Sequence, residues 1–368
     1  MKKITLIILA VLLVAVLGVV LFANRPGDTS QSCQEYYGEM KSLPAAALDW
    51  CNTGEYFSWE STLPINADFE ALNIFYICMG NPQNPAIVMI HGYPTSSFDY
   101  APLFAKLSAE YYVCALDTPG YGFSDKPLDG FDYSIFDDAQ LVDYYIREIV
   151  ALDEFTLLTH DKGDSVGLAL LQIYQTYNNE KPYTINHHFI TNGNIYLPLA
   201  QLTSGQKALL NPAMGPFISS LMIGTRLTEG LANLTFNTTL PQTEIDAYAS
   251  IFDYQDGTAV QHEIIEYLNE RAESEVGWLE ALARSDVPTT IIWGELDAIA
   301  PLAVPDFVWE NYLANIETPA TYWRIPCANH YLQVDEPELV TEILHTTLVD
   351  DPLPSEIDGA NCQAVRIP

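Results

Sequence analysis

The chain contains few basic residues. Over 368 residues it has 15 lysines and arginines against 48 aspartates and glutamates, which gives a formal net charge of −33. A surface of this sign repels phosphate backbones and anionic lipid headgroups. We therefore exclude nucleic acid as a binding partner.

The sequence also lacks internal repeats, low-complexity tracts and the cysteine and histidine spacings typical of zinc sites. We accordingly expect no metal and no organic cofactor. The cysteines stand at positions 33, 51, 78, 114, 327 and 362. Cys33 and Cys51 bracket a short segment and could form a disulfide, and Cys327 and Cys362 could attach the C-terminal tail. The other two lie inside predicted strands, where small core cysteines are common.

One long hydrophobic run is present, at residues 4–23, and it carries no charge. About 20 apolar residues suffice to span a bilayer as a helix, whereas the core of a cleaved signal peptide is shorter. We predict a retained signal anchor. Because Lys2 and Lys3 outnumber Arg25, the remainder should lie on the extracytoplasmic side, where disulfides form. The alternative is a secreted protein whose N-terminal segment is cleaved.

After this run, short apolar stretches typical of buried strands alternate with segments of helical periodicity. This alternation predicts an α/β fold with a mainly parallel, doubly wound sheet. One long segment shows helical periodicity and no convincing strand, so we interpret it as a helical lid inserted between two strands. The expected division is an N-terminal signal anchor at 1–23, a linker at 24–53, the first part of the core at 54–193, the lid at 194–286, the second part of the core at 287–350 and a C-terminal tail at 351–368.

The stretch "THDKGDSVG", residues 159–167, offers two nucleophiles. Ser165 is the central residue of a formal G-x-S-x-G motif, and Asp161 directly follows the predicted strand "FTLLTH". A nucleophile elbow joins the end of a strand to the start of a helix. For Ser165 to occupy it, the strand would have to continue through Asp-Lys-Gly-Asp, which are poor strand residues. The geometry therefore favours Asp161, with Ser165 in the first turn of the helix.

Two further residues complete a candidate triad. Asp297 follows the predicted strand "TTIIWG", and His330 follows the next, "ATYWRI". The order nucleophile, acid, histidine is that of α/β-hydrolases, in which the acid orients the imidazole. In the loop "HGYPTSSF", the backbone N–H of Tyr93 should face the reacting oxygen together with the N–H of Lys162.

With these residues in place, the chain resembles the haloalkane dehalogenase and epoxide hydrolase branch of the α/β-hydrolases. The matching stretches are "HGYPTSSFDY", "DTPGYGFSDKP", "HDKG", "WGELDAIAP" and "NHYLQVDEPE", which run from about residue 55 to 348. Within this branch, "HDKGD", "ITNGNIY" and "DYQDG" most resemble the mesoderm-specific transcript family. The resemblance implies an α/β-hydrolase fold with a helical lid and an aspartate nucleophile.

The sequence departs from the dehalogenases at two positions. They usually have tryptophan after the nucleophile and asparagine in the HG-x-P loop, where this chain has Lys162 and Tyr93. The missing halide-binding groups favour an epoxide over a haloalkane. In epoxide hydrolases, lid tyrosines protonate the epoxide oxygen, and the resemblance offers Tyr196, Tyr248 and Tyr254 for this role.

These residues predict a hydrolase that forms an alkyl-enzyme ester on Asp161 and releases it with water activated by His330. The substrate should be a small, apolar or weakly polar electrophile. The alternatives are a serine esterase that uses Ser165 and a non-catalytic, membrane-tethered binding protein. For the side chain of Lys162 we expect solvent or an ion pair with Asp164, rather than a place in the substrate pocket.

Overall fold

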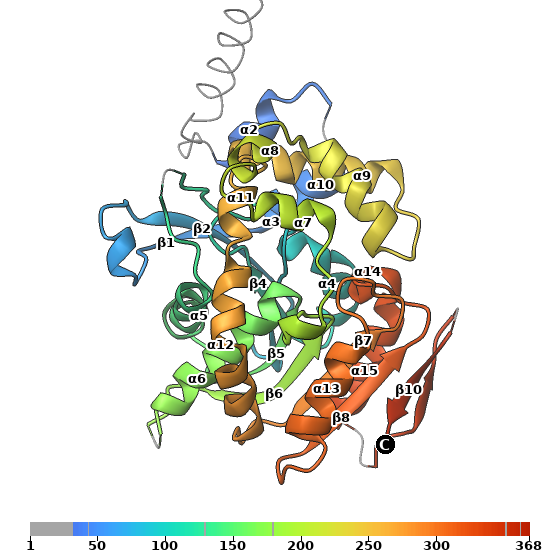
Figure 1. The fold of residues 1–368 in the computed structure, drawn as a ribbon. Helices are drawn as coiled ribbons and strands as arrows, with labels where there is room; N and C mark the ends of the chain where they lie inside the picture. The colour runs from blue at the N-terminus through green and yellow to red at the C-terminus, as the bar shows by residue number, and fades with distance from the viewer. Residues whose placement is uncertain (1–31, 43, 129, 179, 350–351, 361) are drawn as a thin grey trace, which may run out of the picture.

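The computed structural model describes residues 32–42, 44–128, 130–178, 180–349, 352–360 and 362–368. The predicted anchor lies outside these residues. Within the described ranges, none of the helices has both the length and the hydropathy needed to cross a membrane. Figure 1 shows a sheet covered by helices, with a further group of helices at one end of the molecule.

A mixed sheet of ten strands forms the centre of the described chain. Its spatial order is β1-β2-β4-β3-β5-β6-β7-β8-β10-β9, with parallel pairing from β4 to β8 and antiparallel pairing at both edges. The strands are β1 (Glu55–Trp59), β2 (Leu72–Met79), β3 (Ala86–Ile90), β4 (Tyr112–Leu116), β5 (Glu154–His160), β6 (Thr184–Thr191), β7 (Thr289–Gly294), β8 (Ala320–Ile325), β9 (Glu356–Asp358) and β10 (Gln363–Ile367).

The central strands are apolar on both faces because helices cover both faces. In β3 all five residues are buried; Ile87 and Met89 join one core cluster, and Val88 and Ile90 join the other. This split follows from the alternation of side chains along a strand. The strand order reverses at β3, which lies between β4 and β5. The carboxyl ends of β3 and β5 therefore border the switch point at which open α/β sheets bind ligands.

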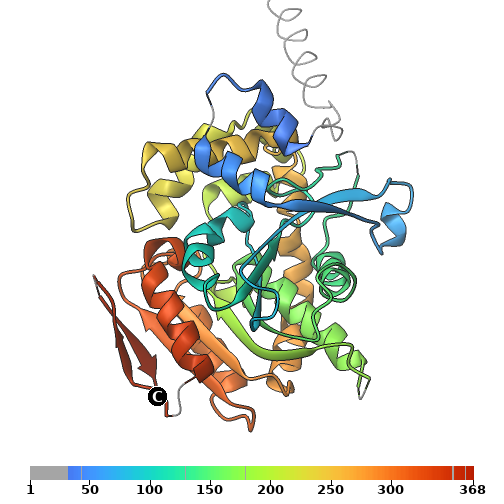
Figure 2. The same cartoon turned by 180° about the vertical axis from the view of Figure 1, so that it is seen from behind.

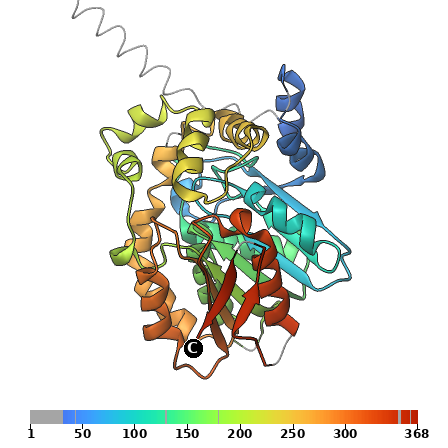
Figure 3. The same cartoon turned by 90° about the vertical axis from the view of Figure 1, so that its right-hand side faces the viewer.

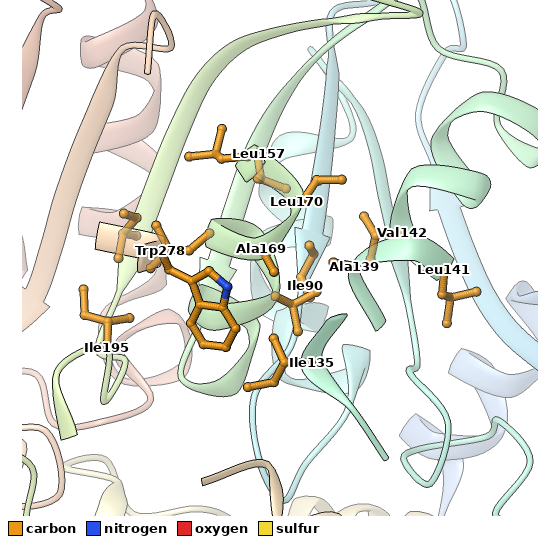
Figure 4. Close-up of a cluster of buried hydrophobic side chains, with 14 of the residues drawn as sticks. Ile90, Ile135, Ala139, Leu141, Val142, Leu157, Ala169, Leu170, Ile195 and Trp278 are labelled. Atoms are coloured by element: carbon orange, nitrogen blue, oxygen red, sulfur yellow. The ribbon is translucent and has the colours of Figure 1, made fainter. Parts of the chain in front are cut away.

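The helices of the core form a layer on each face of the sheet, as the view from behind also shows (Figure 2). One layer contains α5 (Ile135–Tyr144), α6 (Lys162–Thr176), α12 (Tyr267–Ala283) and α13 (Ala303–Val308). The other contains α4 (Ala101–Leu107), α14 (Leu332–Asp335) and α15 (Pro337–Val349). In the first layer, Leu170 of α6 and Trp278 of α12 pack with Ile90 and Leu157 of the sheet (Figure 4).

A helical lid separates β6 from β7. The chain leaves β6 at Thr191 and enters β7 at Thr289, and no strand is assigned to the residues between them. Above α12, the lid consists mainly of α7 (Ser204–Leu209), α8 (Gly215–Ser219), α9 (Gly224–Thr235), α10 (Gln242–Asp253) and α11 (Gln261–Ile264). Figure 3 shows these helices gathered beyond one end of the sheet.

Both expected terminal segments contain secondary structure that the sequence did not reveal. The expected linker forms α2 (Cys33–Glu39) and α3 (Ala45–Thr53), and α3 packs against α10. The expected tail forms β9 and β10, which extend the sheet beyond β8. Neither segment shows a strong apolar period, because each is held by packing on an element far away in sequence.

All six cysteines form disulfides. The pairs Cys33–Cys51 and Cys327–Cys362 are confirmed. The expectation of two reduced core cysteines was wrong, because Cys78 and Cys114 form a third disulfide. These two residues are direct partners in the antiparallel pairing of β2 with β4, which brings their side chains together. The pairing depends on strand register, which the sequence alone does not give.

Candidate active site

Asp161 occupies a sharp turn between β5, which ends at His160, and α6, which begins at Lys162. Its backbone has φ 51° and ψ −115°, a conformation that non-glycine residues adopt rarely and mostly at functional sites. The turn is also crowded. A Cβ on Gly92 would lie 2.4 Å from the Cβ of Asp161. The tight backbone presents the Asp161 side chain at the end of the sheet, as an elbow nucleophile requires.

The two carboxylate oxygens of Asp161 have different partners. Oδ1 accepts a hydrogen bond of 2.8 Å from the backbone N–H of Tyr93, as expected for an oxyanion donor. Oδ2 lies 3.6 Å from Nε2 of His330. The N–H of Lys162, the second expected donor, has no bond to this carboxylate among the described residues. One oxygen is therefore held by the protein, while the other faces His330 and remains available for attack.

Asp297 anchors His330 through a 2.8 Å contact between Oδ2 and the imidazole Nδ1. The other oxygen of Asp297 accepts hydrogen bonds from the N–H groups of Ile299 and Ala300, at 2.8 and 2.9 Å. The side-chain amide of Asn192 also donates to Oδ2, at 2.8 Å. These donors fix the carboxylate, and the carboxylate in turn fixes the tilt of the imidazole.

Burial opposes the charged forms of both partners, but their mutual attraction is stronger. Burial lowers the pKa of His330, yet the charges of Asp297, Asp161 and Asp99 raise it to about 9. Burial raises the pKa of Asp297, yet the charge of His330 and the hydrogen bonds it accepts bring it below its usual value. The resting site at neutral pH thus contains an imidazolium between two carboxylates.

Ser165 occupies a different environment from Asp161. It is fully buried within α6, and its Oγ accepts a 2.8 Å hydrogen bond from Nε of Arg271. A second nitrogen of Arg271 lies 3.4 Å from the backbone carbonyl of Asp161. Ser165 does not line the substrate cavity described below. Its hydroxyl therefore helps to fasten α12 to the elbow and is not presented to a substrate.

Sequence reasoning missed Arg271 and Asn192. Arg271 is fully buried on α12 and shares a face with Leu268, Glu275 and Trp278, all of which are buried. These four positions have the helical spacing i, i+3, i+7 and i+10, which was the available signal that Arg271 points inward. Asn192 immediately follows β6 and bonds both Asp297 and the N–H of Gly294. Its place after a central strand end was the corresponding signal.

The side chain of Lys162 is neither in solvent nor paired with Asp164, as had been expected. It is buried, forms an ion pair with Asp138 of α5, and lies over the ring of Tyr121 at 4.5 Å from its centroid. Asp164 instead accepts hydrogen bonds from the Thr159 hydroxyl and from a backbone N–H. The packing of α5 on α6 brings Asp138 to Lys162, and sequence spacing does not reveal such a contact.

A cavity of about 390 Å³ opens above Asp161 and His330. Its core wall also includes Tyr93, Pro94, Ile299 and Tyr331, and its lid wall is formed by residues of α7, α8 and α9 and the segments next to them. Most of the lining is apolar. The lid-wall residues are Thr203, Gly205, Gln206, Leu209, Ile218, Met222, Ile223, Arg226, Leu227, Gly230, Leu231, Leu234 and Thr235.

The three expected lid tyrosines do not line this cavity. Tyr196 stacks on Phe307, Tyr248 packs against Phe98, and Tyr254 is buried beside other aromatic rings. The proton-donor role is therefore reassigned. Each of the three lies in a lid segment whose orientation the sequence pattern did not define.

Two other tyrosines lie closer to the nucleophile. Tyr93 lines the cavity, and the ring of Tyr267 from α12 lies 5.8 Å from it. Burial and the charge of Asp161 raise the pKa of both hydroxyls above the usual value. Among the described residues, the hydroxyl of Tyr267 has no hydrogen-bond partner. Both groups are protonated at neutral pH and can donate a proton.

The described residues contain one cluster with the composition of a metal site, namely Cys327, Glu336 and Cys362. The two cysteines are joined in a disulfide, so neither supplies a thiolate ligand. The cluster is also part of the C-terminal attachment and does not line the cavity.

Comparison with known proteins agrees with this geometry. Residues 85–181 match the family described as "alpha/beta hydrolase fold". The mesoderm-specific transcript homolog protein of Bos taurus is 30% identical over 304 residues, which cover 80% of this chain and 85% of that protein. The chain belongs to the α/β-hydrolase family. It is an enzyme of hydrolase type, within the group that includes the mesoderm-specific transcript proteins.

Two further relatives of this α/β-hydrolase are enzymes with named activities. Epoxide hydrolase 3 of Xenopus tropicalis is 26% identical over 293 residues, covering 76% of each chain. The crystal structure of haloalkane dehalogenase DbeA from Bradyrhizobium elkani superimposes with a TM-score of 0.62 at 19% identity. It covers 79% of this chain and 96% of the dehalogenase. At that identity the second likeness shows the fold alone.

Proposed function

We propose that this α/β-hydrolase converts epoxides to diols through an alkyl-enzyme ester on Asp161. The observation that carries the proposal is the asymmetric environment of the Asp161 carboxylate. Oδ1 is held by the N–H of Tyr93, and Oδ2 faces the cavity beside His330. A carboxylate in this position is a nucleophile suited to a saturated, electrophilic carbon.

In the first step, a lone pair of Asp161 Oδ2 attacks an epoxide carbon, and the carbon–oxygen bond of the ring breaks. The released electron pair stays on the epoxide oxygen, which takes a proton from the hydroxyls of Tyr93 and Tyr267. The resulting ester carries no negative charge. His330 loses one of the charges that raised its pKa, and its proton restores the tyrosine through solvent.

In the second step, neutral His330 removes a proton from water, which attacks the carboxyl carbon of Asp161. Charge develops on Oδ1, where the N–H of Tyr93 already donates a hydrogen bond. Collapse of this intermediate breaks the ester bond, and the departing alkoxide takes the proton of the new carboxylic acid. The diol leaves, and the site regains its carboxylate, imidazolium and tyrosine.

The cavity favours an epoxide over a haloalkane. A departing halide needs N–H donors, and none of the residues that line the cavity is tryptophan or asparagine. An epoxide needs hydroxyl donors, which Tyr93 and Tyr267 supply. The similarity to epoxide hydrolase 3 supports the same choice.

The two alternatives predicted from the sequence are less consistent with these contacts. A serine esterase would need Ser165 in the cavity, but its hydroxyl is bonded to Arg271 inside α6. A binding protein without activity has no need for an imidazole held 2.8 Å from one carboxylate and 3.6 Å from another. We also propose that residues 4–23 anchor the enzyme in a membrane, with the three disulfide-bonded pairs on the extracytoplasmic side.

A single turnover in heavy-oxygen water tests the proposal. With enzyme in excess over an epoxide such as styrene oxide, water attacks the Asp161 carboxyl carbon. The label should therefore appear in the peptide that contains Asp161, and the first diol should contain little of it. Label that enters the diol directly, with none on Asp161, would refute the ester mechanism. The same reaction with Asp161→Asn serves as the control, because it should form no diol.

A further inference from the structure

Exposed apolar side chains are concentrated on one side of the lid. Among the described residues, ten large hydrophobic side chains are exposed, and five of them lie between positions 214 and 234. Phe217 is 55% exposed and Leu221 is 58% exposed. We call this surface the lid face, and it consists of Met214, Phe217, Leu221, Ile223 and Leu234. Contiguous exposed apolar side chains indicate an interaction surface.

The lid face lies in a segment that is almost free of charge. Between Lys207 and Glu244 the only charged residues are Arg226 and Glu229. These two lie 3.5 Å apart, so their charges offset each other. In a chain with a net charge of −33, this neutral surface is a local exception. A nucleic acid or a basic protein would select a charged surface, whereas a neutral apolar face suits a hydrocarbon interior.

The lid face also borders the mouth of the substrate cavity. Ile223 and Leu234 are exposed at 53% and 43%, and both line the cavity as well. Met222 and Leu227 continue the same apolar wall inward. A molecule that leaves an apolar phase at the lid face can therefore reach Asp161 along an apolar wall.

The start of the described chain lies on the same side of the molecule. Tyr36 of α2 donates a 3.2 Å hydrogen bond to a carbonyl of α10, and it shares a groove with Thr225 of α9. Figures 1 and 3 show α2 beside the lid helices. Only residues 24–31 separate the apolar run from Ser32. Eight residues span at most about 28 Å, so an anchored run would keep the lid end of the enzyme close to the bilayer.

We propose that the lid face docks on a lipid bilayer, so that the cavity mouth opens against the hydrocarbon. The substrates are then lipophilic epoxides that partition into the membrane and enter from it; this part rests on the proposed function. The acidic remainder of the surface would be repelled by anionic lipid, so the partner is a bilayer of zwitterionic lipid.

Docking can be measured without any enzymatic activity. All native cysteines are paired, so Phe217→Cys supplies a single thiol for a polarity-sensitive fluorophore. The full chain is reconstituted in phosphatidylcholine vesicles that contain nitroxide-labelled lipid. Val276→Cys is the matched control, because Val276 is 51% exposed on α12, outside the lid face. We expect a blue shift and at least threefold stronger quenching at position 217, which should weaken in phosphatidylserine vesicles.

Equal quenching at positions 217 and 276 would overturn the proposal. A blue shift that persists without lipid and rises with protein concentration would also overturn it, because it would assign the lid face to a second copy of the chain. The double variant Phe217→Ser/Leu221→Ser then tests substrate entry. Neither residue lines the cavity.

With an epoxide dissolved in the vesicles, the double variant should raise KM about tenfold, whereas kcat/KM for a small water-soluble epoxide should stay within twofold. Val276→Ser should change neither. An equal loss for both epoxides would contradict entry from the bilayer. If no epoxide is turned over by the native enzyme, the proposed function fails while the quenching result still decides whether the lid face docks.

Discussion

The two walls of the cavity differ in kind. The core wall presents Asp161 and His330, and hydrogen bonds from backbone and side-chain donors orient both groups. The lid wall is mainly apolar, and Arg226 is its one charged residue. The core wall thus supplies the reaction, and the lid wall supplies the surface that a substrate must match.

This difference has a structural cause. The groups of the core wall follow the ends of parallel strands, where the neighbouring backbone N–H groups also point toward the ligand site. The lid wall consists of helix faces, whose side chains project without such donors. We therefore expect substitutions on the core wall to change the rate of a chemical step, and substitutions on the lid wall to change substrate affinity.

The largest effect should come from Asp161→Asn. Asparagine keeps the shape of the side chain and an oxygen for the N–H of Tyr93, but it is a poor nucleophile. We expect kcat to fall by about 10⁴-fold or more, as when a nucleophile is removed from a triad. Ser165→Ala is the matched control and should retain activity within about threefold, because Ser165 does not reach the cavity. The reverse result would return the chain to the serine esterases.

The next largest effect should come from His330→Gln. The variant retains Asp161 but cannot activate water, so the alkyl-enzyme ester should form and persist. We expect ester hydrolysis to slow by about 10³-fold, within the range for general bases. Intact-protein mass spectrometry should show the added mass of the epoxide, located on the Asp161 peptide. An adduct on another residue would contradict the assignment of the nucleophile.

The tyrosine pair should have a smaller effect, confined to the first step. Tyr93→Phe and Tyr267→Phe each remove one hydroxyl, and each should slow alkylation by about 10- to 100-fold, as expected for one general acid of two. Rapid-quench measurement of ester formation separates this step from hydrolysis. Tyr248→Phe is the control, since its ring packs outside the cavity. Loss of alkylation in the control alone would restore the original assignment of the lid donors.

Most of the core wall could be predicted from the sequence. Asp161, Asp297 and His330 each follow an apolar strand, and parallel strand ends converge in space. The sheet was predicted because its central strands are continuous apolar runs bounded by turn residues. These signals are local, so they can be read without the tertiary structure.

The remaining features depend on packing between distant segments. The position of Arg271 beside Ser165 requires the lid helix α12 to lie on α6. The pairing of Lys162 with Asp138 requires α5 to lie beside α6. The lid tyrosines were misplaced because helical periodicity shows that a face is buried but does not show which cavity or core it contacts.

The pH dependence should separate the two chemical steps. The Asp161 charge helps to raise the pKa of His330 to about 9, together with Asp297 and Asp99, and neighbouring His160 opposes it only weakly because burial keeps it neutral. Esterification removes the Asp161 charge, so the pKa of His330 should fall in the intermediate. Hydrolysis requires neutral His330. Its rate should therefore rise about tenfold per pH unit and level off below pH 9, because one proton is lost. A plateau reached only above pH 9 would show that the ester leaves His330 unchanged.

The smallest effect should come from the lid wall. Leu231 lines the cavity on α9 and contributes apolar contact without touching the triad. Leu231→Ala should raise KM for a small epoxide by about 3- to 10-fold, since a few methylene groups in an apolar pocket change discrimination by roughly this amount. The rate of ester hydrolysis should stay unchanged, and bulkier epoxides should lose less affinity because the cavity is larger. Single-turnover rates across epoxides of increasing size measure both quantities. A change in ester hydrolysis equal to the change in KM would mean that the lid wall also positions the reacting groups, and the separation between the two walls would no longer hold.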